Sequence, residues 1–284
     1  MKTGLVLEGG GLRDLFTAGI LDIMMERSIC FDGIIGVSAG ATFGCNYKSH
    51  QIGRSLRYNK KMAGNWRYCS IRSLLTTGDL VGAVYAYHTL PTEIDVFDND
   101  TFTSDPTEFC IVCTDALKGE PIYHRVQSFN YEGLEWLRAS ASLPIVSRPV
   151  HMDGHIMLDG GITDSIPLKY WQSQGYERNI VILTQPSGFL KKRTKLMPFF
   201  QIFCRKYPAI IEAMGRRHEM YNAQLDYLAS EQKKGLTLVL CPEQAIDIGR
   251  TEMNTDKMQQ VYDYGLDYAK RHIEKIEQFM NTHT

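Results

Sequence analysis

Two apolar segments, each followed by glycines and then by a helical pattern, occupy the first 50 residues and restrict the possible folds most strongly. The first, TGLVLEGGG, predicts a short buried strand that ends in a glycine loop, and FDGIIGVS predicts a second strand. Apolar residues at helical spacing predict a helix over 12–29, and AGATFGCNYKSH begins another. Strands that alternate with helices in this way are typical of βαβ units around a parallel sheet.

The rest of the chain continues this pattern less regularly. Residues 50–105 predict helices and loops that cover one side, and Asp153-Gly154 predicts a two-residue hairpin turn. Further strands are expected in TEFCIVCTDA, GEPIYHRV, NIVILTQP and GLTLVLCPE, and further helices in YEGLEWLRASASLP, 196–234 and 255–281. With 284 residues, 44% of them hydrophobic, the chain is expected to form one α/β domain with a helical C-terminal elaboration.

Charge and cysteine usage indicate where such a chain would act. A net charge of −1 provides no overall field that would attract nucleic acid. The start, MKTGLVLEGGG, does not resemble a signal peptide, and no stretch approaches the roughly 18 consecutive apolar residues of a membrane span. Seven scattered cysteines suit a reducing compartment, and Cys110 and Cys113 lie in a strand-like run that favours burial over zinc or redox chemistry. The expected location is the cytoplasm.

Ser38 lies at the centre of a G-x-S-x-G motif, Gly36-Val37-Ser38-Ala39-Gly40, between the second strand and the second helix. A sharp strand-to-helix turn exposes a serine hydroxyl above the sheet edge, and the flanking glycines Gly36 and Gly40 let the backbone bend. The start of the following helix offers N–H groups to a developing oxyanion. The motif therefore indicates a nucleophilic serine, although a simple glycine-rich turn would look the same.

A second glycine loop, EGGGLR at residues 8–13, lies between the first strand and the first helix. Three consecutive glycines expose backbone N–H groups that can bind a phosphate or an oxyanion. The loop lacks the spacing of a P-loop or a dinucleotide-binding turn, so nucleotide binding is the weaker interpretation. Adjacent parallel strands would place both loops at one carboxyl edge of the sheet, which suits acyl transfer.

None of the eight histidines is an obvious partner for Ser38. His218 and His272 lie on charged helical faces, and His283 is next to the C-terminus. His151 and His155 would align with Asp159 on a helix, but the hairpin turn between them argues against a metal site. No metal ion is therefore expected.

Asp159, in MLDGG, is the remaining candidate for a base. It follows an apolar strand and precedes Gly160 and Gly161, so it is expected at a strand end where the backbone can be approached closely. A carboxylate there could accept the Ser38 proton directly, and partial burial would raise its pKa from the reference value near 3.9. A plain turn-forming aspartate is the alternative.

Taken together and in this order, EGGGLR (residues 8–13), GVSAG (36–40) and LDGG (158–161) resemble the motifs of the patatin-like phospholipase family. ASASLP (139–144) and DSIPL (164–168) resemble stretches before and after the family's aspartate loop. The resemblance covers roughly residues 3–186 and most resembles the bacterial, stand-alone branch.

The resemblance implies a three-layer α/β/α fold with a mainly parallel sheet. It also implies a catalytic core over 1–186 and a helical extension over 187–284 that contributes one late strand. The implied activity is that of a lipase- or phospholipase-type serine esterase without a cofactor, acting on a lipid or fatty-acyl ester through an acyl-enzyme intermediate. In that mechanism Ser38 is the nucleophile, Asp159 is the base, and Gly9, Gly10 and Gly11 form the oxyanion hole.

Arg13 would help to hold the glycine loop, but Asp14 stands where the family loop usually has a further glycine. We expect Asp14 to point away as an early-helix acid, which is harmless or mildly favourable. An acid that faced the oxyanion would oppose its charge, and a catalytically weak acyl-binding protein that kept the cleft is therefore the alternative function.

Residues 189–211 mix basic clusters with large apolar side chains. They could rest on an anionic membrane surface, but the pattern favours a helix that packs its apolar face on the core and leaves its lysines in solvent. Transient peripheral contact with a membrane is thus implied by the family resemblance and not by this segment.

Overall fold

The computed structural model describes residues 1–249 and 251–281 and is organised around a mixed sheet in the order β5-β6-β3-β2-β1-β7-β8, with β4 paired to β3. β2, β1, β7 and β8 pair in parallel with their neighbours, and β2 also runs parallel to β3. β4, β5 and β6 add the antiparallel pairs. The strands are β1 (Lys2–Leu7), β2 (Gly33–Val37), β3 (Glu108–Asp115), β4 (Glu120–Arg125), β5 (Val150–Met152), β6 (His155–Asp159), β7 (Tyr176–Ile182) and β8 (Thr237–Leu240).

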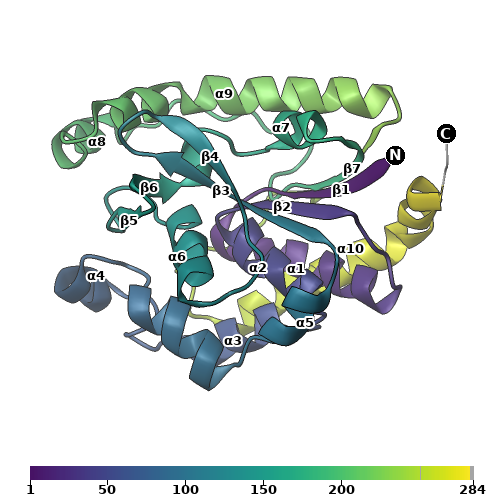
Figure 1. The fold of residues 1–284 in the computed structure, drawn as a ribbon, viewed down its shortest axis with the longest axis horizontal. Helices are drawn as coiled ribbons and strands as arrows, with labels where there is room; N and C mark the ends of the chain where they lie inside the picture. The colour runs from purple at the N-terminus through teal and green to yellow at the C-terminus, as the bar shows by residue number, and fades with distance from the viewer. Residues whose placement is uncertain (250, 282–284) are drawn as a thin grey trace.

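Helices cover both faces of this sheet (Figure 1). α1, α2, α3 and α10 lie on one face, and α7 and α9 lie on the other. The helices are α1 (Asp14–Glu26), α2 (Ala39–Lys48), α3 (Arg54–Met62), α4 (Ile71–Thr77), α5 (Asn99–Ser104), α6 (Tyr131–Ser140), α7 (Leu168–Ser173), α8 (Met197–Phe203), α9 (Pro208–Lys233) and α10 (Thr255–Asn281). Short helices of other types are η1 (Gly11–Arg13), the π-helix η2 (Tyr85–Ile94) and η3 (Gly160–Ile162).

The alternation of side chains along β1 shows why the sequence forms three layers. Leu5 and Leu7 pack into the core beneath α1 and α10, whereas Val6 between them packs into the core beneath α7 and α9. Both faces are buried, so the strand is an uninterrupted apolar run, as is typical of parallel sheets. The predicted α/β class and the mainly parallel sheet are confirmed.

The local predictions for the hairpin and the cysteine-containing strand also agree with the structure. Asp153 and Gly154 join β5 to β6. Both have positive φ, 52° and 76°, as the two central residues of a type I′ hairpin turn require. Cys110 and Cys113 are buried in β3 on opposite faces of the sheet. All seven cysteines are free thiols.

The segment 189–211 differs from the single packed helix that its pattern favours. Only Met197–Phe203 is helical before Pro208 begins α9. Phe200 is buried, together with Cys204, but Phe199, Ile202 and Phe203 are exposed. The helix is too short to bury a full apolar face, so most of its large side chains remain in solvent. Within the residues that the structure describes, no helix is both long and apolar enough to cross a bilayer.

Candidate active site

Ser38 occupies a strained turn between β2 and α2. Its φ of 55° and ψ of −124° are outside the regions that side chains other than glycine usually adopt. The carbonyl of Ser38 accepts hydrogen bonds from the N–H groups of Ala41 and Thr42, which begin the helix. These hydrogen bonds help to maintain the strained backbone conformation. The turn places Ser38 at the carboxyl edge of the sheet, as the motif predicts.

Two glycines in the motif allow α2 to approach the sheet closely. A Cβ on Gly36 would lie 2.6 Å from the Cα of Ala41, and a Cβ on Gly40 would lie 2.6 Å from the carbonyl oxygens of Leu7 and Glu8. All these neighbours are backbone atoms that cannot rotate away. A larger residue at either position would therefore displace the turn that carries Ser38.

The glycine loop that follows β1 lies directly against this turn. A Cβ on Gly9 would lie 2.5 Å from the carbonyl oxygen of Val37 and 2.7 Å from the Cβ of Ser38. Gly11 has a φ of 64°, which suits glycine. Because β1 and β2 are adjacent and parallel, their two loops meet at one edge of the sheet.

Asp159 reaches the same place through strand pairing along β3. β4 pairs with one edge of β3, so β2 and β6 share the opposite edge. Along that edge Val37 pairs with Val112, and Asp159 pairs with the next residue, Cys113. β2 runs parallel and β6 antiparallel to β3, so the two strands approach each other end to end. Ser38 and Asp159 therefore line one cavity.

The Asp159 side chain is oriented by the turn that follows it. Its Oδ1 accepts a hydrogen bond of 2.8 Å from the N–H of Gly161, and the residue is only 3% exposed. A Cβ on Gly160 would lie 2.2 Å from the carbonyl oxygen of Val112, so only glycine fits there. The two glycines thus permit the close packing that brings Asp159 to β3.

Two serines of the ASASLP stretch form hydrogen bonds to the backbone of Ser38 and of Asp159. The sequence interpretation missed this role. The Ser140 hydroxyl accepts from the N–H of Ser38 at 2.8 Å and donates to the carbonyl of Val112 at 2.7 Å. The carbonyl of Ser142 accepts from the N–H of Asp159 at 2.8 Å. The only signal in the sequence was the resemblance of this stretch to the family.

Glu8 is a second functional candidate that the sequence interpretation missed. Its carboxylate is 3% exposed and accepts hydrogen bonds from the Thr184 N–H at 2.7 Å and the Tyr221 hydroxyl at 2.6 Å. The glycine loop is thereby fixed to the end of β7 and to α9. A charged residue directly after a buried apolar strand was the available signal.

Asp14 begins α1 as expected and is absent from the lining of the cavity described below, but it lies in the protein interior. It is completely buried, and neither carboxyl oxygen has a hydrogen bond of normal geometry within the described residues. Burial, reinforced by the charge of Glu8, raises the pKa of Asp14 well above its usual value, although Arg13 and the N–H of Gly10 oppose the shift. The environment therefore favours a neutral carboxyl, which does not repel an oxyanion.

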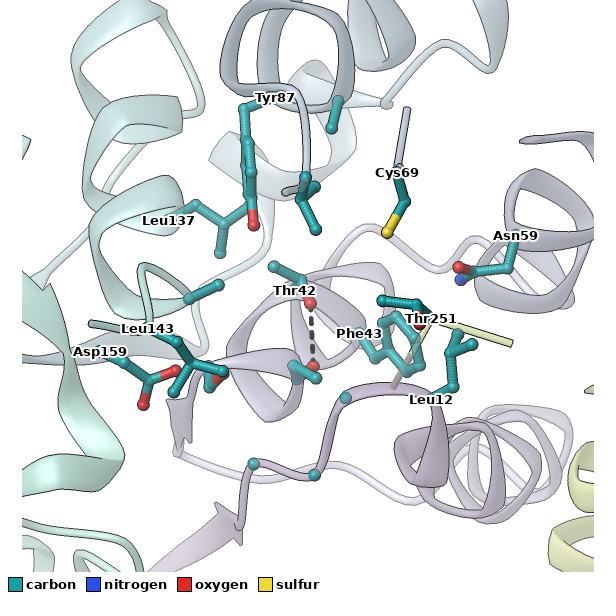
Figure 2. A pocket seen from close by; sticks show the side chains of 18 of the residues that line it. Leu12, Thr42, Phe43, Asn59, Cys69, Tyr87, Leu137, Leu143, Asp159 and Thr251 are labelled. Atoms are coloured by element: carbon teal, nitrogen blue, oxygen red, sulfur yellow. Dashed lines mark hydrogen bonds between the residues drawn. The ribbon is translucent and has the colours of Figure 1, made fainter. Parts of the chain in front are cut away.

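The cavity beside these residues has a volume of about 350 Å³ (Figure 2). The glycine loop, Arg13, Ser38 and Asp159 line its polar part. Figure 2 shows Asp159 beside Leu143, with Tyr87 pointing in from above next to Leu137. The other walls are largely apolar, so the cavity can hold a hydrocarbon chain next to Ser38.

The described histidines lie outside this cavity. The Nδ1 of His155 is 3.0 Å from Asp115, His272 contacts the carbonyl of Tyr268, and His283 lies outside the described residues. His151 is exposed on β5, and no group of three potential ligands suited to a metal ion occurs in the described part of the chain.

Two family models match parts of the chain. A family model described as patatin-like phospholipase matches residues 5–170, which is more than half of the chain. A second model, described as a domain of unknown function (DUF6363), matches residues 207–281.

Two curated proteins and one solved structure are among those similar to this chain. The chain is 25% identical over 295 residues to lysophospholipase nte1 of Aspergillus fumigatus, and the match covers 96% of this chain and 18% of the fungal protein. It is 33% identical over 194 residues to the uncharacterized protein YjjU of Escherichia coli, covering 66% and 53% of the two chains. The chain thus spans less than a fifth of the length of the fungal relative. The crystal structure of VipD from Legionella pneumophila aligns with a TM-score of 0.47 at 13% identity, covering 96% of this chain and 67% of VipD.

Proposed function

Because the chain belongs to the patatin-like phospholipase family, we propose that it is a serine acyl hydrolase that cleaves fatty-acyl esters of lipids. The observation that best supports this is the contact between the two loops, since a Cβ on Gly9 would lie 2.7 Å from the Cβ of Ser38. N–H groups so close to a nucleophile can stabilise the negative charge that forms on the attacked carbonyl oxygen.

In the first half of the proposed reaction, the Ser38 hydroxyl attacks the ester carbonyl and Asp159 accepts its proton. The tetrahedral oxyanion is stabilised by the N–H groups of Gly9, Gly10 and Gly11. Burial favours the neutral form of Asp14, which adds no negative charge near this oxyanion. The C–O bond to the alcohol then breaks, Asp159 returns the proton to the leaving oxygen, and the acyl group remains on Ser38.

In the second half, water attacks the acyl-enzyme and Asp159 accepts a proton from it. Collapse of the second tetrahedral intermediate breaks the bond to Ser38, whose oxygen recovers a proton from Asp159. The products are a fatty acid and the free enzyme, so protons and electron pairs balance without a cofactor.

Labelling with a fluorophosphonate probe tests this proposal directly. We expect the wild-type protein to form a stable adduct on Ser38, because an activated serine displaces fluoride from phosphorus. The Ser38→Ala variant should remain unlabelled, whereas Ser140→Ala tests whether the neighbouring serine reacts instead. An unlabelled wild-type protein would rule out a serine hydrolase, and equal labelling of Ser38→Ala would rule out Ser38 as the nucleophile. The first of these results would favour the acyl-binding alternative.

We further propose that this is a cytoplasmic protein that contacts anionic membranes transiently through the segment 190–206. Leu190, Leu196 and the α8 residues Phe199, Ile202 and Phe203 are each between 53% and 65% exposed. Five basic residues in the same segment are exposed and would complement anionic lipid head groups: Lys192, Arg193, Lys195, Arg205 and Lys206. The buried α8 residue Phe200 belongs to the same apolar cluster as Ile162, three residues after Asp159, so α8 is linked through this cluster to the loop that follows Asp159.

The Phe199→Ser/Phe203→Ser variant should bind phosphatidylglycerol-containing vesicles at least roughly tenfold more weakly, because each aromatic ring contributes apolar area to the interface. Co-sedimentation measures this binding, and high salt should weaken binding of the wild-type protein. Val96→Ser, which changes an exposed apolar residue on another part of the surface, serves as the control. Equal vesicle binding by the double variant would exclude this surface. Hydrolysis of a soluble short-chain ester should be unaffected in either case.

A further inference from the structure

The region matched by the family model of unknown function contributes directly to the cavity. α9 lies in that region and crosses the face of the sheet opposite α1 and α2 (Figure 1). Arg217 on α9 lines the cavity, and so does Lys191 from the loop before α8. They join Arg13 and Arg54 in the lining, and most of the remaining wall is apolar.

Arg217 is held beside Asp159. Its Nε donates to the carbonyl of Gly161, and its Nη2 lies 3.3 Å from the position that a Cβ on Gly161 would occupy. The Oδ1 of Asp159 lies 3.1 Å from that same point. With Nε fixed in this way, the planar guanidinium still has its Nη groups, which form the two-pronged donor that suits phosphate oxygens.

Lys191 is fixed to α9 through its backbone. Its N–H donates to Asn222 Oδ1 at 2.9 Å, and its carbonyl accepts from Asn222 Nδ2 at 3.1 Å. The Nζ lies 4.1 Å from the centre of the Tyr221 ring. α9 therefore positions both cations, one as part of the helix and one by anchoring a neighbouring loop.

The cavity passes over the carboxyl edge of the sheet and has two chemically different ends. The apolar end belongs to the core on the α1 and α2 side, with Phe43, Tyr58, Met62, Leu90, Phe97, Phe129, Leu134 and Leu137. Arg54 also lines this end, but it is buried in an ion pair with Asp95. Ser38 and Asp159 lie at the edge itself, and Arg217 comes from the opposite face. An ester whose acyl chain fills the apolar end would direct its alcohol portion toward the cations.

We propose that Arg217 and Lys191 bind the phosphate of the substrate's head group, so that the cavity selects acyl esters of phosphate-bearing alcohols over uncharged esters. The inference rests on the proposed function only for the orientation of the acyl chain. It assigns to α9, and thus to the C-terminal region, the role of recognising the head group.

Titration calorimetry tests binding without catalysis. In the Ser38→Ala protein, octyl phosphate should bind more tightly than octyl glucoside, which has the same chain and an uncharged head. Adding Arg217→Gln should weaken octyl phosphate binding by roughly 10- to 100-fold, as expected for loss of charged hydrogen bonds, and leave octyl glucoside unchanged. Arg217→Lys should bind octyl phosphate with intermediate affinity, because lysine keeps the positive charge but lacks the two-pronged donor of arginine. Arg216→Gln removes a neighbouring cation that is exposed and pairs with Glu219, so it should have no effect.

Kinetics provide the second measurement. For the active enzyme, Arg217→Gln and, separately, Lys191→Gln should raise KM for an acyl glycerol phosphate at least roughly tenfold more than KM for the matching acyl glycerol. Equal losses on both substrates would overturn the proposal, since they would indicate a general effect on Asp159. Inorganic phosphate that bound as tightly as octyl phosphate would overturn the assignment to a lipid head group. If no ester were hydrolysed but octyl phosphate still bound through Arg217, the hydrolase proposal would fail and the phosphate site would stand.

Discussion

Asp159→Asn is expected to reduce kcat for a short p-nitrophenyl ester by roughly 10²- to 10⁴-fold, the usual contribution of a general base. The amide has the shape of the carboxylate, and its oxygen can still accept from the N–H of Gly161, so the turn should survive. The amide cannot, however, take the proton of Ser38. Initial rates together with the melting temperature distinguish this chemical loss from unfolding.

Asp153→Asn in the same hairpin is the matched control. Asp153 is exposed and has a positive φ that asparagine also tolerates, so its substitution should leave both rate and stability unchanged. His151→Ala and His155→Ala should likewise retain activity. Near-normal turnover in a folded Asp159→Asn protein would eliminate the proposed Ser38–Asp159 dyad, and loss of turnover in either histidine variant would point to a different base.

Gly9→Ala is expected to lower kcat by roughly 10²- to 10³-fold, comparable to the loss of one oxyanion donor. The new methyl group would lie 2.5 Å from the carbonyl oxygen of Val37 and 2.7 Å from the Cβ of Ser38. These atoms belong to a strand end and a strained turn, so the glycine loop must move away from Ser38. Overpacking of this kind costs about 1–3 kcal/mol, and we therefore also expect a melting temperature several degrees lower.

Gly215→Ala provides the contrast for this substitution. On α9 a Cβ at position 215 would meet only the flexible end of Met197 at 3.6 Å, so alanine fits and should stabilise the helix by about 1 kcal/mol. Full activity of Gly9→Ala would show that the N–H groups of the loop are not needed at their present positions. Fluorophosphonate labelling of the same variant would show whether Ser38 itself still reacts.

Local sequence patterns were sufficient to predict the order and type of most elements. The apolar run Leu5, Val6 and Leu7 and the glycines that follow predict a buried strand and a loop from residues that are neighbours in the chain. The turn at Asp153-Gly154 and the helix at 255–281 were predicted at the positions where they occur. Such features depend on the backbone preferences of individual residues and on the spacing of apolar residues. Both can be read from a short stretch of sequence.

Contacts between distant segments could not be predicted in the same way. The local pattern placed Asp14 at the start of a helix, but it contained no sign that the packing of the layers buries this residue completely. The apolar side chains of α8 were expected to pack on the core, but only Phe200, with the neighbouring Cys204, does so. The spacing of these residues in the sequence does not show which of them will find a partner. Burial of this kind depends on which surfaces meet after the chain has folded.

The sequence by itself determined the α/β class, the two glycine loops at one sheet edge, and the candidates Ser38 and Asp159, because each follows from local pattern or from the ordered set of motifs. Only the tertiary structure decided how these candidates meet. The register along β3 brings β2 and β6 end to end, Ser140 and Glu8 fix the loops, and α9 brings Arg217 to the cavity. These arrangements depend on pairing and packing between residues far apart in the chain, which hydrophobic period and turn preference do not encode.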